Sequence, residues 1–153
     1  MNAEDLLQRY AAGERDFTGV KLPGVRLVDK ILNQVIFKGA DFSDAYFESS
    51  GFDEVDLSFA NLRRIRFFES GFGRANLEAA DFSDAIFSQG SLKGANLTRA
   101  IFRRAVLSEV SFKNANLSYA DLSEASEFSI YYCKGAIFHE TIMPDGSIRS
   151  NNS

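Results

Sequence analysis

Large apolar residues recur along this chain with a step of five, which matches neither the 3.6-residue period of an α-helix nor the two-residue period of a strand. From Phe17 to Leu122, every fifth residue is Phe or Leu, for 22 consecutive positions. Two residues before most of these lies a small or β-branched residue, as from Ala40 to Ala120. The repeating unit is therefore small–polar–large–polar–polar, with two inward-facing residues in every five.

The register of this pattern slips once, near the C-terminal end. After Leu122 the next large residue is Phe128, six positions on, and the step of five then resumes through Cys133, Phe138 and Met143. We therefore predict a one-residue insertion between Leu122 and Phe128, as a bulge or a change at a corner of the fold.

The segments GANLTRAIFRRAVL, from residue 94, and ANLSYADLSEA, from residue 115, resemble pentapeptide repeats, whose consensus is roughly A-(D/N)-L-x-x. The resemblance covers about Phe17 to Met143 and is closest to cyanobacterial members of that family. It implies an all-β solenoid, a right-handed quadrilateral parallel β-helix with four repeats per coil and the Leu/Phe column inside.

Longer spacings in the sequence support a four-sided coil independently. Asn76, Asn96 and Asn116 recur every 20 residues, and the motif DFSDA begins at Asp41 and again at Asp81. Both spacings are multiples of 20, and 40 is not a multiple of 15. A coil of four five-residue sides fits this pattern and a three-sided coil does not.

The two ends of the chain depart from the repeat. Residues 1–13 are expected to form a helical cap, with Asn2 as N-cap and Gly13 at its end, because a solenoid must cover its open ends; a partner-binding helix is the alternative. Residues 14–143 form the β-helix, and 144–153 a turn and flexible tail, with RSNNS disordered. Apolar residues near the last coil either cover it or form a homodimer contact: Tyr131, Tyr132, Ile137, Ile142 and Ile148.

Stacking at 20 residues per coil places acidic and basic residues in alternate coils on one face. Such a charge ladder is expected to neutralise itself in solvent, and docking of a charge-alternating partner is the alternative. Its members are Asp41, Asp44, Arg63, Arg64, Asp81, Asp84, Arg103, Arg104, Asp121 and Glu124.

A different face carries outward apolar residues and is the candidate partner surface, because contiguous exposed apolar area often marks a binding site. Its members are Tyr46, Phe68, Ile86 and Val106. Scattered surface apolar residues are the alternative. The face over Phe52, Phe72, Leu92 and Phe112 is rich in Gly, Ser and Lys and is expected to be merely solvated.

The sequence offers no constellation for catalysis. The only cysteine, Cys133, falls in an inward column, and the only histidine, His139, is six residues away on another side of the coil. No phosphate-loop, zinc or nucleophile-elbow motif occurs. We therefore expect no enzyme activity, no catalytic residue, no cofactor and no metal.

Charge and composition restrict the partners. The net charge of −4 and pI near 5.0 argue against direct nucleic-acid binding. The start MNAEDLLQRY has acids where a signal peptide needs a basic segment, and no apolar run spans a bilayer, so we expect a cytoplasmic protein without membrane contact. The leading hypothesis is a non-catalytic protein-interaction or scaffold module, monomeric or dimeric through a coil end. The alternative, taken from the resemblance, is a DNA mimic that binds DNA gyrase.

Overall fold

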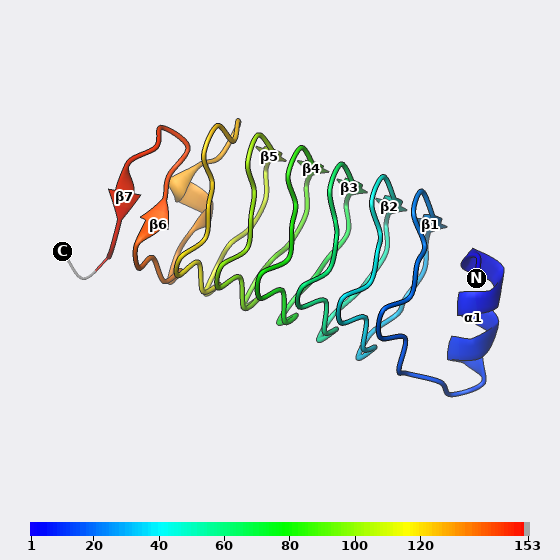
Figure 1. Cartoon of the computed structure of the whole chain (residues 1–153). Helices are drawn as coiled ribbons and strands as arrows, with labels where there is room; N and C mark the ends of the chain where they lie inside the picture. Colours follow the sequence, from blue (N-terminus) through cyan, green and yellow to red (C-terminus); the bar gives the residue numbers. More distant parts are fainter. Residues whose placement is uncertain (152–153) are drawn as a thin grey trace.

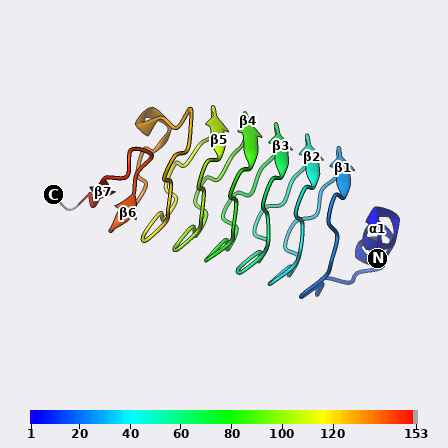
Figure 2. The same cartoon turned by 45° about the horizontal axis from the view of Figure 1, so that its top comes forward.

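The computed structural model describes residues 1–151, which form a long coil of parallel turns with one helix laid across its N-terminal end (Figure 1). Figure 2 shows the strands of one face aligned side by side along the coil. No helix within residues 1–151 is long and apolar enough to cross a membrane. In chain order the elements are α1 (Ala3–Ala11), β1 (Arg26–Val28), β2 (Tyr46–Glu48), β3 (Arg66–Phe68), β4 (Ile86–Ser88), β5 (Val106–Ser108), the 3₁₀ turn η1 (Ile130–Tyr132), β6 (Thr141–Ile142) and β7 (Ile148–Arg149).

The coils are 20 residues long until the last one. Strands β1 to β5 form one parallel sheet in sequence order, and each residue pairs with the one 20 positions on, as Leu27 with Phe47. The other three faces carry isolated parallel bridges with the same step, as Asp16 with Ile36. The structure therefore confirms the four-sided parallel β-helix that the repeat predicts.

The interior consists of the Phe and Leu residues of the five-residue repeat. All 22 of them are buried, none more than 3% exposed. Neighbouring rings pack closely: Phe82 stacks on Phe102 with centroids 4.8 Å apart and planes only 6° from parallel. The small column packs around these rings, and a Cβ added at Gly90 would lie 3.1 Å from Phe67 Cδ1. The core is thus filled to contact along the whole rod.

Each five-residue unit ends in a tight turn. In this turn, the residue two positions after the large Phe or Leu adopts a left-handed backbone conformation. Phe59 (φ 60°) and Arg64 (φ 58°) show that non-glycine residues accept this conformation here. The turn on most sides is closed by a backbone bond such as Ala40 N–H to the Phe37 carbonyl, 3.0 Å. The Asp or Asn before the large residue accepts from the N–H just after it, as Asn96 Oδ1 does from Thr98 (3.1 Å). This bond explains why the repeat favours Asp or Asn there.

The face with the extended sheet closes its turns differently. There, serine hydroxyls of the small column take the place of the missing backbone bond: Lys30 N–H donates to Ser50 Oγ (3.1 Å) and Ser50 N–H to Ser70 Oγ (2.9 Å). Ser70 Oγ donates in turn to the Phe68 carbonyl (2.9 Å). At Lys30 and Ser50, these hydroxyls therefore accept from backbone N–H groups that the turns of the other faces bond internally.

The register does lengthen by one residue, in a range that overlaps the predicted one between Leu122 and Phe128. Leu107 N–H bonds to the Ser126 carbonyl, 19 positions on as in earlier coils, whereas Phe112 N–H bonds to the Tyr132 carbonyl, 20 positions on. From Asn116, which bridges to Ile137, the coil length is 21. The extra residue therefore lies between Ser126 and Tyr132, where the chain turns through η1.

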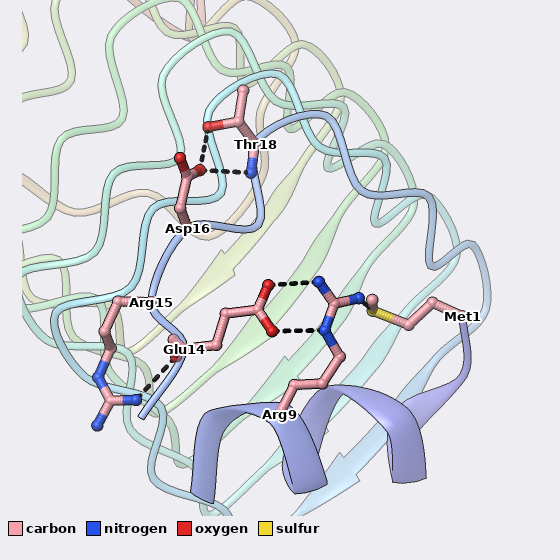
Figure 3. A network of polar contacts seen from close by, with 6 residues as sticks. All are labelled: Met1, Arg9, Glu14, Arg15, Asp16 and Thr18. Atoms are coloured by element: carbon pink, nitrogen blue, oxygen red, sulfur yellow. Dashed lines mark hydrogen bonds and ion pairs between the residues drawn. The ribbon is translucent and has the colours of Figure 1, made fainter. Parts of the chain in front are cut away.

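The N-terminal helix is fastened at both of its ends. Asn2 Oδ1 accepts from Asp5 N–H (2.9 Å) and the Asp5 carboxylate accepts from Asn2 N–H (3.2 Å), while Leu6 is fully buried with the core. Figure 3 shows the polar contacts that follow the helix, where Arg9 and Glu14 form an ion pair. The Arg9 hydrogen bond holds the pKa of Glu14 below its ordinary value. The helix is thus tied to the segment that enters the first coil.

The C-terminal segment is ordered where the sequence predicts a flexible tail. Strands β6 and β7 form an antiparallel pair, and Asn151 bonds to the last coil: its side chain donates to the Ala136 carbonyl (2.8 Å) and accepts from Phe138 N–H (3.3 Å). The prediction of disorder is therefore wrong for residues 149–151, because polar side chains there find backbone partners. The last two residues of the predicted tail, 152 and 153, lie outside the described part of the chain.

Candidate interaction surfaces

The four residues of the candidate partner surface all lie on the β1–β5 sheet. Tyr46 in β2 and Phe68 in β3 meet edge to face, with ring centroids 5.6 Å apart. Ile86 in β4 is 41% exposed and pairs in register with Val106 of β5. The sheet thus brings the pairs Tyr46–Phe68 and Ile86–Val106 together on one face.

Two arginines that the sequence interpretation missed flank Tyr46. Arg26 and Arg66 pair in register with it, one coil before and one coil after, and their guanidinium carbons lie 4.1 and 5.4 Å from the ring centroid. Neither forms an ion pair with a carboxylate in residues 1–151. Stepping 20 residues either way from Tyr46 identifies both from the sequence.

The hydroxyl of Tyr46 is also held in place. It donates to Glu48 Oε2 at 2.7 Å, and this bond to a carboxylate raises the pKa of Tyr46. The ring is therefore fixed by two cations, an aromatic edge and a hydrogen bond, although it remains partly exposed. We call Arg26, Tyr46, Arg66 and Phe68 the aromatic–arginine cluster.

The charge ladder consists of ion pairs between neighbouring coils. Arg64 reaches back to Asp44 with two bonds (2.8 and 3.0 Å). Arg104 reaches back to Asp84 in the same way (2.9 and 3.1 Å). The other two arginines reach forward at longer range: Arg63 to Asp81 (3.8 Å) and Arg103 to Asp121 (3.9 Å).

Three aspartates of the ladder also have a structural role. Asp41, Asp81 and Asp121 each accept from the backbone N–H two residues on, at 2.9 Å. This bond, more than any charge, lowers the pKa of Asp41. Glu124 forms no ion pair in the described part of the chain. Because the ladder is largely engaged internally, it does not present the unbroken row of acids that a copy of a DNA backbone requires.

Cys133 and His139 are not brought together as a reactive pair. Cys133 is 7% exposed, and burial raises the pKa of its thiol to about 11, so the thiol stays protonated at neutral pH. His139 is exposed, and its ring lies edge-on to Tyr119 with centroids 5.2 Å apart. Residues 1–151 contain no group of three or more His, Cys, Asp or Glu placed to hold a metal ion.

Comparison with known proteins agrees with this architecture. The family model described as pentapeptide repeats matches overlapping segments that span residues 16–126. Among solved structures, alr5209, a pentapeptide repeat protein from Nostoc PCC 7120, is 26% identical, over 88% of this chain and 93% of that one, with a TM-score of 0.50.

Two further solved structures are similar. HetL, a pentapeptide repeat protein involved in heterocyst differentiation regulation from the cyanobacterium Nostoc sp. strain PCC 7120, is 24% identical over 97% of this chain and 100% of that one, with a TM-score of 0.34. AT2G44920, a pentapeptide repeat protein from the Arabidopsis thaliana thylakoid lumen, is 27% identical over 60% and 67%, with a TM-score of 0.38. No curated protein sequence matches significantly.

Proposed function

Because the chain belongs to the pentapeptide-repeat family, we propose that it is a rigid, non-catalytic module that binds another protein through its β1–β5 face. A fold of this kind supplies surfaces, and its function depends on which side chains those surfaces carry. The proposal therefore rests on the character of one face.

The observation that carries the proposal is the aromatic–arginine cluster. Tyr and Arg are enriched among the residues that dominate binding energy in protein interfaces. Here Tyr46 is fixed between Arg26 and Arg66, so little side-chain freedom remains to be lost on binding. Both guanidinium groups remain available to carboxylates or carbonyls of a partner. Ile86 and Val106 extend the same face with apolar area.

Affinity capture from a lysate of the source organism tests this proposal. The double variant Tyr46→Ala/Phe68→Ala removes the aromatic part of the cluster, and we expect it to retain the partner at least about tenfold less than the wild type. Phe59→Ala is the matched control, because Phe59 is an exposed aromatic residue on another face. Circular dichroism of each variant verifies the fold.

Two outcomes would contradict the proposal. If the double variant retains the same partner as strongly as the wild type, the β1–β5 face is not the binding surface. If Phe59→Ala loses the partner equally, binding does not depend on the cluster.

The alternative of a DNA mimic that binds DNA gyrase has less support from the charges of this chain. Arg63, Arg64, Arg103 and Arg104 pair with the acids of the charge ladder. We therefore expect no inhibition in a gyrase supercoiling assay. Inhibition that weakens with added salt would favour the mimic instead.

A further inference from the structure

Three lysines form a column on the face that follows the β1–β5 sheet along the chain. Lys93, Lys113 and Lys134 each come directly after a buried residue of the repeat, and they lie on successive coils: Gly94 N–H bonds to the Lys113 carbonyl (2.8 Å) and Asn114 N–H to the Lys134 carbonyl (2.9 Å). All three are exposed, and none forms an ion pair with a carboxylate in the described chain. We call them the lysine column.

The lysine column stacks three charges of the same sign, unlike the charge ladder. In the charge ladder, Asp44, Arg64, Asp84 and Arg104 alternate in sign from coil to coil. The lysines instead repeat the same sign at a coil spacing of about 4.8 Å. Like charges directly opposite each other on adjacent strands are destabilising. Within residues 1–151, none of the three lysines has an ion-pair partner that would offset this repulsion.

Around Lys93 and Lys113 the sequence is poor in acids: between Gly90 and Ala120, Glu109 is the only Asp or Glu. Residues 90–108, 110–120 and 128–139 include six Lys and Arg and no Asp or Glu, so the rest of the chain carries a net charge of −10 to give the total of −4. Small neutral residues flank the lysines in the sequence. They are Ser91, Gly94, Ser111, Asn114 and Gly135.

We propose that the lysine column binds an extended acidic segment of a polypeptide that runs along the solenoid axis. Three lysines on successive coils span about 10 Å, and side chains on one face of an extended peptide recur every 6.6–6.8 Å, so two or three carboxylates fit over the column. Lysine ammonium groups on flexible stems adapt to such a spacing.

A polypeptide fits this surface better than a nucleic acid does. Nucleic acids carry a dense row of phosphates and bind broad basic surfaces, and their affinity comes from many such contacts. Here the basic area is narrow, and the net −10 on the rest of the chain repels a large polyanion. An acidic peptide can place its carboxylates on the column alone. This surface is separate from the aromatic–arginine cluster, so it adds a second binding site.

Fluorescence anisotropy with labelled probes at about 20 mM salt, where screening is weak, tests the proposal. The probes are a peptide of six Glu-Ser repeats, the matched peptide of Gln-Ser repeats and a single-stranded oligo-dT of the same length. We expect the Glu-Ser peptide to bind, and the other two to bind at least about tenfold more weakly.

The variant Lys113→Glu converts the lysine column to alternating charge. We expect it to weaken Glu-Ser binding at least about tenfold and to raise the thermal midpoint, because its neighbours Lys93 and Lys134 now attract it. The raised midpoint separates lost binding from lost folding. Lys38→Glu is the matched control: it makes the same change of charge at an exposed lysine on another face, and we expect binding within about twofold of wild type.

Three results would overturn the proposal. Equal binding of the Gln-Ser peptide would show that carboxylates are not recognised. Tighter binding of oligo-dT would assign the column to nucleic acid. Unchanged Glu-Ser binding by Lys113→Glu would place the peptide elsewhere on the molecule.

Discussion

At the scale of single residues, stability depends on how completely each large side chain is enclosed. Phe82 is fully buried, and the rings of Phe72, Phe87 and Phe102 lie within 6.3 Å of its ring, centroid to centroid. Phe59, which also lies in the repeat region, is 57% exposed because it occupies the turn. Residues of the same type thus contribute differently according to their place in the five-residue unit.

We expect Phe82→Ala to lower the free energy of unfolding by about 3–5 kcal/mol, because it removes a buried ring and leaves a cavity that packed neighbours cannot fill. A urea melt followed by circular dichroism measures the change. Phe59→Ala serves as control and should change stability by less than about 0.5 kcal/mol. A loss below about 1 kcal/mol for Phe82→Ala would show that the stack is loosely packed.

At the scale of elements, neighbouring coils are linked by backbone bonds inside the faces and by ion pairs on two of them: the charge ladder, and the face where Arg74 pairs with Glu54. The Arg64–Asp44 and Arg104–Asp84 pairs join successive coils, and the arginine hydrogen bonds lower the pKa of both aspartates. Since these pairs are exposed, each adds little at physiological salt. Their contribution is nevertheless detectable through its dependence on pH.

We expect Asp44→Asn/Asp84→Asn to be less stable than the wild type at neutral pH. A carboxylate whose pKa is lower in the folded chain stabilises it above the ordinary value of 3.8 and loses this effect as the pH falls through the folded value. The difference in thermal midpoint between the wild type and the double variant should therefore shrink as the pH falls below about 3.8 at low salt. Asp29→Asn is the control, because Asp29 forms no ion pair with any residue from 1 to 151. A gap that stays constant with pH would contradict the assignment.

At the scale of the whole molecule, the protein is a rod in which each coil contacts only its neighbours. The two end coils have a neighbouring coil on one side only, so they depend on the segments that cover them. The N-terminal end is covered by α1, with Leu6 inserted into the core. The C-terminal end is held by the β6–β7 pair and by Asn151, which bonds to Ala136 and Phe138. Loss of an end contact should therefore affect the nearest coil most.

We expect Asn151→Ala to speed amide hydrogen exchange at Phe138 at least about tenfold, because the amide loses its acceptor. Exchange at Phe72, in the middle of the rod, should hardly change, since coupling in a solenoid passes only between adjacent coils. Nuclear magnetic resonance measures both. Equal acceleration at both amides would mean that the rod opens as one unit.

By itself, the sequence determined which residues face inward, because each five-residue turn sets the direction of its own side chains. The spacings of 20 and 40 residues between its repeated motifs indicated the length of a coil. The capping residues outside the repeat predicted the helical N-terminus, because capping by Asn2 is a local interaction.

Only the tertiary structure decided what depends on contacts between coils. The bonds from Lys30 N–H to Ser50 Oγ and from Ser50 N–H to Ser70 Oγ join residues of adjacent coils. The enclosure of Tyr46 by two arginines depends on side chains 20 residues apart in the sequence. The ordering of Asn151 depends on a coil 13 residues before it. These interactions leave no local pattern, because their partners become neighbours only when the chain has coiled.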